Sequence, residues 1–142
     1  DLTSAFDCVD HDILLYKLEH YGVIRKCLEM FTSYLSERTQ HLIINDQISQ
    51  EGKISRGVPQ GSILGPILFI VCINYLAINM PQINPGVMYV DDTSFCVNVD
   101  KEQNNDQVSQ NTLELAGNWF AANKGVLHKK KTEVLKFQTI TK

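Results

Sequence analysis

The spacing of apolar residues predicts two helices in the first quarter of the chain. Asp10 is a residue type that caps helix N-termini, and the apolar residues after it recur at nearly helical spacing until Gly22, a typical helix end. A second helix is predicted over residues 24–36, because its apolar residues fall on one face. Residues 40–45 then read as a strand that ends in a turn at Asn45–Asp46, before a polar stretch.

An apolar run over residues 63–73 predicts a core helix that continues to about Leu76. Pro66 suits the first turn of this helix, where its missing amide proton leaves no bond unmade. The run is shorter than the ~20 apolar residues that a membrane span needs, so we expect no membrane association.

The second half of the chain predicts a hairpin, a helix and a final strand. Pro81 and Pro85 are expected to bracket a loop, and two apolar β-type runs over residues 86–99 predict the hairpin. Apolar residues then follow a helical stripe from Val108 to Phe120, and residues 134–137 read as a closing strand. These elements predict an α+β fold, with helices packed on one face of an antiparallel sheet.

Composition is consistent with one globular domain over residues 1–142. The chain is 44% hydrophobic and 20% charged, and a chain of this length buries about two-thirds of its unfolded surface. Its four cysteines form no Cys-x-x-Cys pair. This argues against a zinc site and predicts buried thiols in a reducing compartment.

Two adjacent carboxylates, Asp91 and Asp92, fall between the two apolar runs of the predicted hairpin. Two neighbouring carboxylates repel each other unless a cation lies between them, and Mg²⁺ prefers hard oxygen ligands of this kind. A solvated Asp-Asp turn is the alternative, because acidic residues are common in turns.

Three further segments accompany the segment that contains this pair, and the four are labelled A to D in chain order. Motif A is DLTSAFDCVDHDILL (residues 1–15), motif B is GVPQGSILGPILF (residues 57–69), motif C is YVDD (residues 89–92), and motif D is NKGVLHKKKTEVLKF (residues 123–137). In this order they resemble motifs A to D of the reverse transcriptases of non-long-terminal-repeat (non-LTR) retrotransposons, the LINE-type and jockey-like elements. The resemblance extends over nearly the whole chain.

The resemblance implies a partial reverse transcriptase domain over residues 1–142, a polymerase palm without fingers and thumb. It implies an RNA-directed DNA polymerase that adds deoxynucleoside triphosphates (dNTPs) to the 3′-hydroxyl of a DNA primer on an RNA template. Further partners would be the missing fingers, thumb and endonuclease regions, and the location would be nucleus and cytoplasm, as a ribonucleoprotein. The chain begins with Asp1 rather than Met and has no leader, so we expect a fragment that is inactive in isolation.

Motif positions also imply the catalytic metal site. Asp1 and Asp91 would be the main ligands of two Mg²⁺ ions, with Mn²⁺ as an alternative, and Asp92 would be the third acid. Asp7 and Asp10 lie close by in the sequence, but both fit capping of the first helix better than metal binding.

Four other residues take roles from the resemblance. Phe6 would lie against the sugar of the incoming nucleotide and exclude a 2′-hydroxyl, although taken alone it reads as a core residue. Gln60 would hydrogen-bond a base or sugar, and Gly61 would let the backbone approach the template, although the same segment alone reads as a plain turn. Lys131 would neutralise pyrophosphate or donate a proton to it, although a solvated lysine face is the alternative.

The net charge of −3 is unlike the basic footprint of a duplex-binding domain. Basic residues do gather near the C-terminus, and the family holds most of its template contacts in fingers and thumb. An isolated palm therefore fits the acidic balance. The C-terminal basic residues are Lys124, Lys129, Lys130, Lys131, Lys136 and Lys142.

Three positions depart from the family pattern. Ser4 replaces a usual lysine, which removes a positive charge and predicts weaker nucleotide binding. Tyr75 replaces a usual aspartate and His128 a usual asparagine, while the metal ligands are intact. An inactive or co-opted remnant that binds RNA or protein is therefore the main alternative. An RNA-templated RNA polymerase fits less well, because it must admit the 2′-hydroxyl that Phe6 would exclude. A magnesium phosphohydrolase fits less well, because it would explain the acids but not motif B.

Overall fold

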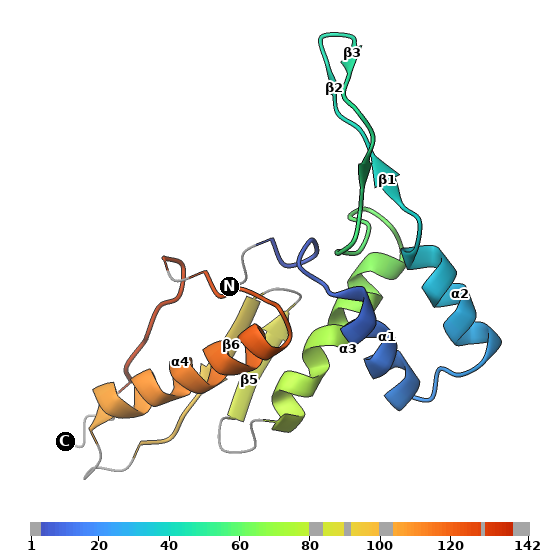
Figure 1. The fold of residues 1–142 in the computed structure, drawn as a ribbon. Coiled ribbons are helices and arrows are strands. Elements are labelled where there is room, and N and C mark those ends of the chain that lie inside the picture. Colours follow the sequence, from blue (N-terminus) through green and yellow to red (C-terminus); the bar gives the residue numbers. More distant parts are fainter. Residues whose placement is uncertain (1–3, 80–83, 90–91, 100–103, 129, 138–142) are drawn as a thin grey trace.

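A computed structural model describes residues 4–79, 84–89, 92–99, 104–128 and 130–137. Helices and short antiparallel hairpins alternate along the chain (Figure 1). Helices α1 (His11–His20), α2 (Lys26–Leu35) and α3 (Leu64–Asn79) form one part, in which α1 packs against both α2 and α3. Helix α4 (Asn105–Ala122) lies beside the hairpin of β5 (Asn84–Tyr89) and β6 (Asp92–Cys96).

Helix α1 begins and ends as the sequence predicts. The Asp10 side chain accepts a hydrogen bond from the backbone N–H of Ile13 at 3.2 Å, which satisfies one of the donors left free at a helix start. The chain leaves the helix at Tyr21 and Gly22, and Gly22 has a positive φ of 88°.

Helix α2 is confirmed but begins two residues later than predicted. Arg25 has a φ of 54° and its side chain makes no capping hydrogen bond, so the helical conformation starts only at Lys26. The helix ends at Leu35, which is buried.

Residues 39–53 form a hairpin that projects away from the helices (Figure 1). Strand β1 (Thr39–Gln40) pairs with β4 (Gly52–Lys53), and β2 (Ile43–Ile44) pairs with β3 (Gln47–Ile48). The predicted turn at Asn45–Asp46 is confirmed, and both residues have the positive φ of a tight hairpin turn. The strand predicted over 40–45 is confirmed in part, because it is divided into β1 and β2, and Ser49 bonds the Leu42 backbone between the two short ladders.

Helix α3 provides the centre of the core. It begins at Leu64, and the backbone N–H of Gly65 donates to Ser62 Oγ at 2.9 Å, while Pro66 lies in the first turn as predicted. The helix continues three residues beyond the predicted end at Leu76. No helix in the part of the chain that the structure describes is long and apolar enough to cross a membrane.

The second hairpin is confirmed with earlier bounds. Strands β5 and β6 are antiparallel, and Tyr89 pairs with Asp92 at the end of the ladder. The loop predicted between the two prolines is corrected at Pro85, which lies within β5 next to a register shift. A proline is tolerated there because an irregularity interrupts the ladder. Pro81 lies outside the described residues.

Helix α4 confirms the predicted apolar stripe. The side chain of Asn104 caps its start, and Thr112, Ala116 and Phe120 are buried at a spacing of four residues. The strand predicted over residues 134–137 is wrong. No strand in the described part of the chain pairs with this segment, and the Phe137 side chain is 91% exposed.

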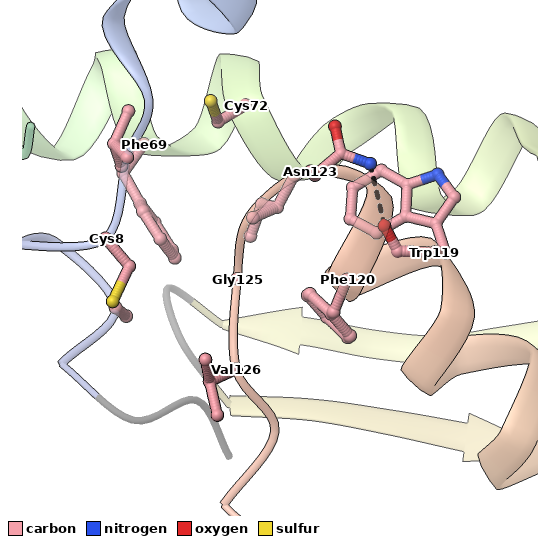
Figure 2. Close-up of a pocket in the computed structure, with 11 residues that line it drawn as sticks. Cys8, Phe69, Cys72, Trp119, Phe120, Asn123, Gly125 and Val126 are labelled. Atoms are coloured by element: carbon pink, nitrogen blue, oxygen red, sulfur yellow. Dashed lines mark hydrogen bonds between the residues drawn. The ribbon is translucent and has the colours of Figure 1, made fainter.

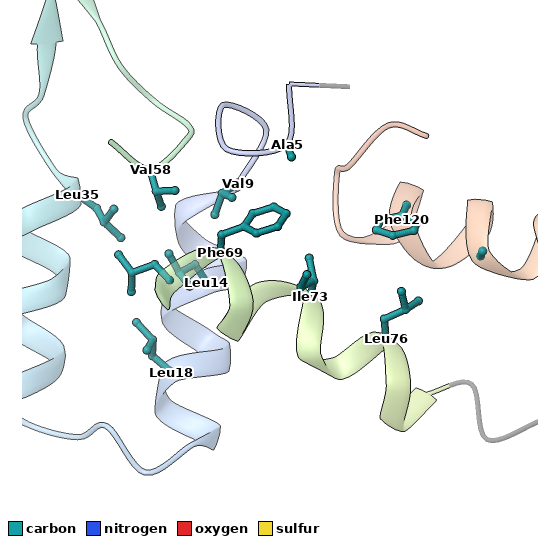
Figure 3. Packing of buried hydrophobic residues seen from close by; sticks show 12 residues of the cluster. Ala5, Val9, Leu14, Leu18, Leu35, Val58, Phe69, Ile73, Leu76 and Phe120 are labelled. Atoms are coloured by element: carbon teal, nitrogen blue, oxygen red, sulfur yellow. The ribbon is translucent and has the colours of Figure 1, made fainter. Parts of the chain in front are cut away.

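The buried apolar residues form one cluster between the helices (Figure 3). Its members come from motif A, the motif B loop and all four helices, namely Ala5, Val9, Leu14, Leu18, Leu35, Val58, Leu68, Phe69, Ile73, Leu76, Ala116 and Phe120. The described strands form three separate two-stranded antiparallel sheets. The fold is therefore a mixture of helices and small antiparallel sheets, as an α+β class requires.

The expectation of buried thiols is half correct. Cys8 and Cys72 are half-buried, whereas Cys27 and Cys96 are exposed. Burial raises the pKa of the Cys72 thiol, so it stays protonated and packs as a small apolar residue.

Candidate functional site

Backbone hydrogen bonds join the motif A turn, residues 4–10, to the motif B loop, residues 56–61. The N–H of Val58 donates to the carbonyl of Phe6 at 2.9 Å, and the N–H of Gly57 donates to the carbonyl of Val9 at 2.7 Å. These two motifs are far apart in the sequence but in direct contact in the fold.

Gly57 allows this close approach. Its φ is +88°, and a Cβ atom at this position would lie 2.9 Å from the Asp7 Cα and 3.1 Å from the Phe6 carbonyl oxygen. Both obstacles are backbone atoms that cannot move without opening the junction. The His11 ring Nε2 also lies 2.8 Å from the Gly57 carbonyl oxygen, which ties the loop to the start of α1. Only glycine fits here.

The side chain of Gln60 is bound to motif A. Its Nε2 donates to Asp7 Oδ1 at 3.0 Å on the exposed side of the junction. The prediction that Asp7 caps the first helix is therefore wrong, since Asp10 occupies the cap and Asp7 holds the motif B amide instead. Gly61 has a φ of +78° with open space where a side chain would be.

Phe6 is half-buried and stacks on Phe69 of α3, with ring centroids 4.9 Å apart and an angle of 27° between the planes. The ring thus packs against the core without being fully enclosed by it. This geometry accommodates the core role and leaves part of the residue accessible.

The predicted metal ligands are described only in part. Asp92 begins β6 at the end of the hairpin and its side chain is exposed. Asp1 and Asp91 lie outside the described residues. Within those residues, no group of three histidine, cysteine, aspartate or glutamate side chains is close enough to hold a metal ion.

Asp10 links α1 to the segment that follows α4. Its Oδ2 accepts a hydrogen bond from Lys124 Nζ at 2.6 Å, while its Oδ1 caps the helix at Ile13. Burial alone would raise the pKa of the Asp10 carboxyl. The bonds from Lys124 and Ile13, together with the charges of Lys124 and Arg56, outweigh burial and hold the pKa below its usual value. Asp10 is thus an ionised structural residue, as the sequence predicts.

Lys17 is a buried cation that the sequence analysis missed. Its side chain, on a residue that is 7% exposed, donates to the carbonyl of Cys72 at 2.5 Å and to Asn123 Oδ1 at 2.6 Å. Its Nζ also lies 4.9 Å from the centroid of the Trp119 ring. Burial lowers the pKa of Lys17. Its position in the sequence could have indicated burial, because Lys17 falls on the apolar face of α1 beside Leu14 and Leu18.

Lys131 lies in a short turn beyond α4 and is exposed. Its backbone N–H donates to the carbonyl of His128 at 3.0 Å, and the hydroxyl of Thr132 donates to the same carbonyl at 3.1 Å. The His128 ring is half-buried, and its Nδ1 has no hydrogen-bond partner among the described residues.

The other two departures from the family pattern have clear structural places. Ser4 has a φ of 48°, and its carbonyl accepts bonds from the N–H groups of Asp7 and Cys8 in the motif A turn. Tyr75 lies edge-on to Tyr21 at 5.4 Å, and its ring centroid is 5.6 Å from Lys17 Nζ.

A small apolar cavity of about 40 Å³ lies between the motif A turn, α3 and the segment after α4 (Figure 2). Its walls include Ala5 and Cys8 from motif A, Phe69 from α3, and Gly125 and Val126 from motif D. Motifs A and D therefore face each other across an incompletely filled space.

Comparison with known proteins identifies the family of the chain. The model of the family "Reverse transcriptase (RNA-dependent DNA polymerase)" matches residues 1–141. The chain is 40% identical to the RNA-directed DNA polymerase from mobile element jockey of Drosophila melanogaster over 85 residues. This match covers 60% of the chain and 9% of that protein. The chain is also 36% identical to the probable RNA-directed DNA polymerase from transposon BS of the same species over 77 residues. This match covers 50% of the chain and 8% of that protein.

A third relative is the retrovirus-related Pol polyprotein from type-1 retrotransposable element R2 of Popillia japonica, which is 24% identical over 86 residues. That match covers 61% of the chain and 14% of the relative, so the chain spans only a small part of these curated proteins. The resemblance drawn from the four motifs is confirmed by these matches. The chain belongs to the reverse transcriptase family.

Proposed function

We propose that this chain is the palm region of a non-LTR retrotransposon polymerase, which adds dNTPs to a primer 3′-hydroxyl under the direction of an RNA template. The observation that carries the proposal is the family match over residues 1–141, supported by the junction of motifs A and B at Gly57. The presence of small antiparallel hairpins beside helices is compatible with a palm.

The donor set suits a pair of divalent cations, Mg²⁺ first and Mn²⁺ as the alternative. Asp1 and Asp91 would hold the ions with Asp92 as the third acid, and the exposed position of Asp92 at the hairpin end fits a carboxylate that meets a ligand. Bound there, the ions would supply charge stabilisation to the attacking oxygen and to the leaving pyrophosphate.

The chain's own side chains would bind and orient the nucleotide. Phe6, fixed on one side by Phe69, would lie against the sugar and exclude a 2′-hydroxyl. Gln60, oriented by Asp7, would meet a base or sugar edge, and Gly61 would allow close approach of the template backbone. Lys131 would offset the charge of the departing pyrophosphate or donate a proton to it.

The proposed partners extend beyond the chain. They are the RNA template, the DNA primer, dNTPs, and the fingers, thumb and endonuclease regions of a longer protein. The small share of each relative that the chain covers supports such a longer protein, and the net charge of −3 supports template contacts made elsewhere. We propose that such an assembly would act in the nucleus and cytoplasm as a ribonucleoprotein.

The second candidate is an inactive or co-opted remnant. Ser4, Tyr75 and His128 favour it, because each departs from the family pattern. The intact acids at positions 1, 91 and 92 favour the enzyme.

Primer extension separates the two candidates. The segment is restored to its full-length frame and supplied with an RNA template, a DNA primer, Mg²⁺ and dNTPs. The wild-type protein should extend the primer, and the variant Asp91→Ala/Asp92→Ala should not. A folded wild-type protein that extends nothing would favour the remnant, and RNA binding would then be measured.

A further inference from the structure

We propose that Lys17 and Asp10 are positioning residues that fix the start of motif D against motif A. Asp10 is the N-cap of α1 and Lys17 lies seven residues further along, within the helix, and they hold the consecutive residues Lys124 and Asn123. The inference rests on the proposed function, because positioning matters only if Lys131 and the motif A acids meet one substrate.

The first contact is made by Lys17. Its Nζ bridges the Asn123 side chain and the carbonyl of Cys72 in α3, so one ammonium group joins α1, α3 and the end of α4. The Asn123 amide is itself oriented, because its Nδ2 donates to the carbonyl of Trp119 at 2.8 Å. The oxygen that Lys17 meets therefore has a fixed direction.

The second contact is the ion pair of Asp10 and Lys124. Lys124 has a φ of 59°, a left-handed conformation that is unfavourable for a non-glycine residue. In this conformation the chain turns away from α4, and the ammonium group reaches the helix cap of α1 at 2.6 Å. The direction in which motif D leaves the helix is thus tied to the first turn of α1.

Apolar packing alone does not fix this distance. The cavity of about 40 Å³ separates Ala5 and Cys8 of motif A from Gly125 and Val126 of motif D (Figure 2). Facing walls across such a space lose dispersion contacts and can shift. The two polar contacts lie beside this gap and supply the directional constraint that the packing lacks.

The choice of a lysine also favours positioning over simple stability. A buried ammonium group has a desolvation cost, and an apolar side chain of similar size is often as stable or more so. No described carboxylate is paired with Lys17. Carbonyl oxygens and aromatic rings offset the desolvation cost of its ammonium group instead. These partners specify where three helices meet.

The consequence for the reaction follows from geometry. Lys131 is seven residues beyond Lys124, on the segment that these contacts direct. A displacement of about 1 Å in a catalytic group costs on the order of 100-fold in rate. Loss of the Lys17 and Asp10 contacts should therefore slow nucleotide addition without weakening the binding of template and primer.

The test uses the full-length protein and single-turnover addition of one dNTP. Lys17→Met keeps the apolar stem but removes the charge, and Asp10→Asn keeps a good helix cap but weakens the pair with Lys124. Each should lower the rate of addition by about 10-fold or more, with the dissociation constant for primer–template unchanged. Lys136→Met is the matched control, since it removes an exposed ion pair with Asp106 and should change neither quantity.

A double-mutant cycle separates positioning from a general structural role. If Lys17 acts through Lys131, then Lys17→Met should slow the Lys131→Ala variant by less than two-fold. Losses that multiply in the double variant would overturn the inference, as would a normal rate in Lys17→Met.

Amide hydrogen exchange of residues 125–131 provides a measurement that needs no activity. It should rise in Lys17→Met and Asp10→Asn but not in Lys136→Met, and unchanged exchange would contradict the inference. A wild-type protein that extends nothing contradicts the proposed function, and the exchange data then decide the positioning role alone.

Discussion

The projecting hairpin consists of two short ladders and a turn, the junction of motifs A and B consists of loop segments joined by backbone hydrogen bonds, and the two bury their residues very differently. In the hairpin, Ile44 is 65% exposed and its apolar neighbours are similarly open, whereas at the junction Val58 and Val9 are both buried in the core. Packing in the core therefore helps to hold the junction. The exposed hairpin depends on its turn and its two short ladders.

The largest expected effect tests this difference in burial. Leu14→Ala, at a fully buried position next to the junction, should lower the free energy of unfolding by about 2–5 kcal/mol. Ile44→Ala in the hairpin should stay within about 0.5 kcal/mol of the wild type. Urea unfolding followed by the fluorescence of Trp119 measures both. Equal losses would contradict the comparison.

The second prediction compares two glycines of motif B. Gly57→Ala should cost about 2–4 kcal/mol, because its Cβ meets the Asp7 backbone at a positive φ. Gly61→Ala should cost only about 1 kcal/mol, because its site is open and only the φ is unfavourable. The same urea titration applies, and a Gly57→Ala protein as stable as Gly61→Ala would remove the argument for a close approach.

The third prediction concerns pH. The folded-state pKa of Asp10 lies below the ordinary value of 3.8, so its stabilising contribution is complete above that pH and is lost as pH falls through the folded-state pKa. Asp10→Asn should therefore lower the free energy of unfolding by about 1 kcal/mol at pH 6, since Lys124 is half exposed. The difference between wild type and variant should shrink as the pH falls below the ordinary value of 3.8. A difference that stays constant as the carboxyl becomes protonated would show that the charge is not the cause.

The smallest effect is expected at the hairpin tip. Asp46 has a φ of 61° in the turn after Asn45, and Asn-Gly is the preferred sequence for such a turn. Asp46→Gly should strengthen the hairpin by about 0.5 kcal/mol, seen as slower amide exchange at Ile43 and Ile48 with no change in α1. Faster exchange in the hairpin would contradict the assigned turn.

The helices could be predicted from the sequence because their signals are local. The cap at Asp10, the end at Gly22 and the stripe of α4 depend on spacing within one segment. The strand predicted over residues 134–137 failed because a strand needs a partner, and a short, mostly apolar segment does not say whether one is present.

The candidate site was predicted in its motifs but not in its connections. Motif order assigned roles to Phe6, Gln60 and Gly61 that stay predictions, and nothing in the sequence indicated that Asp7 holds Gln60. Lys17 was missed for a related reason, since its partners lie 55 and 106 residues away. Such contacts depend on how the helices pack, and local pattern carries little information on that.

RNA-templated primer extension by the full-length protein, run side by side with deoxynucleotides and ribonucleotides, tests the central claim most directly. The account predicts extension with deoxynucleotides, little with ribonucleotides because of Phe6, and none with Asp91→Ala/Asp92→Ala. Extension that survives loss of both acids, or no extension by a folded wild-type protein, would contradict it.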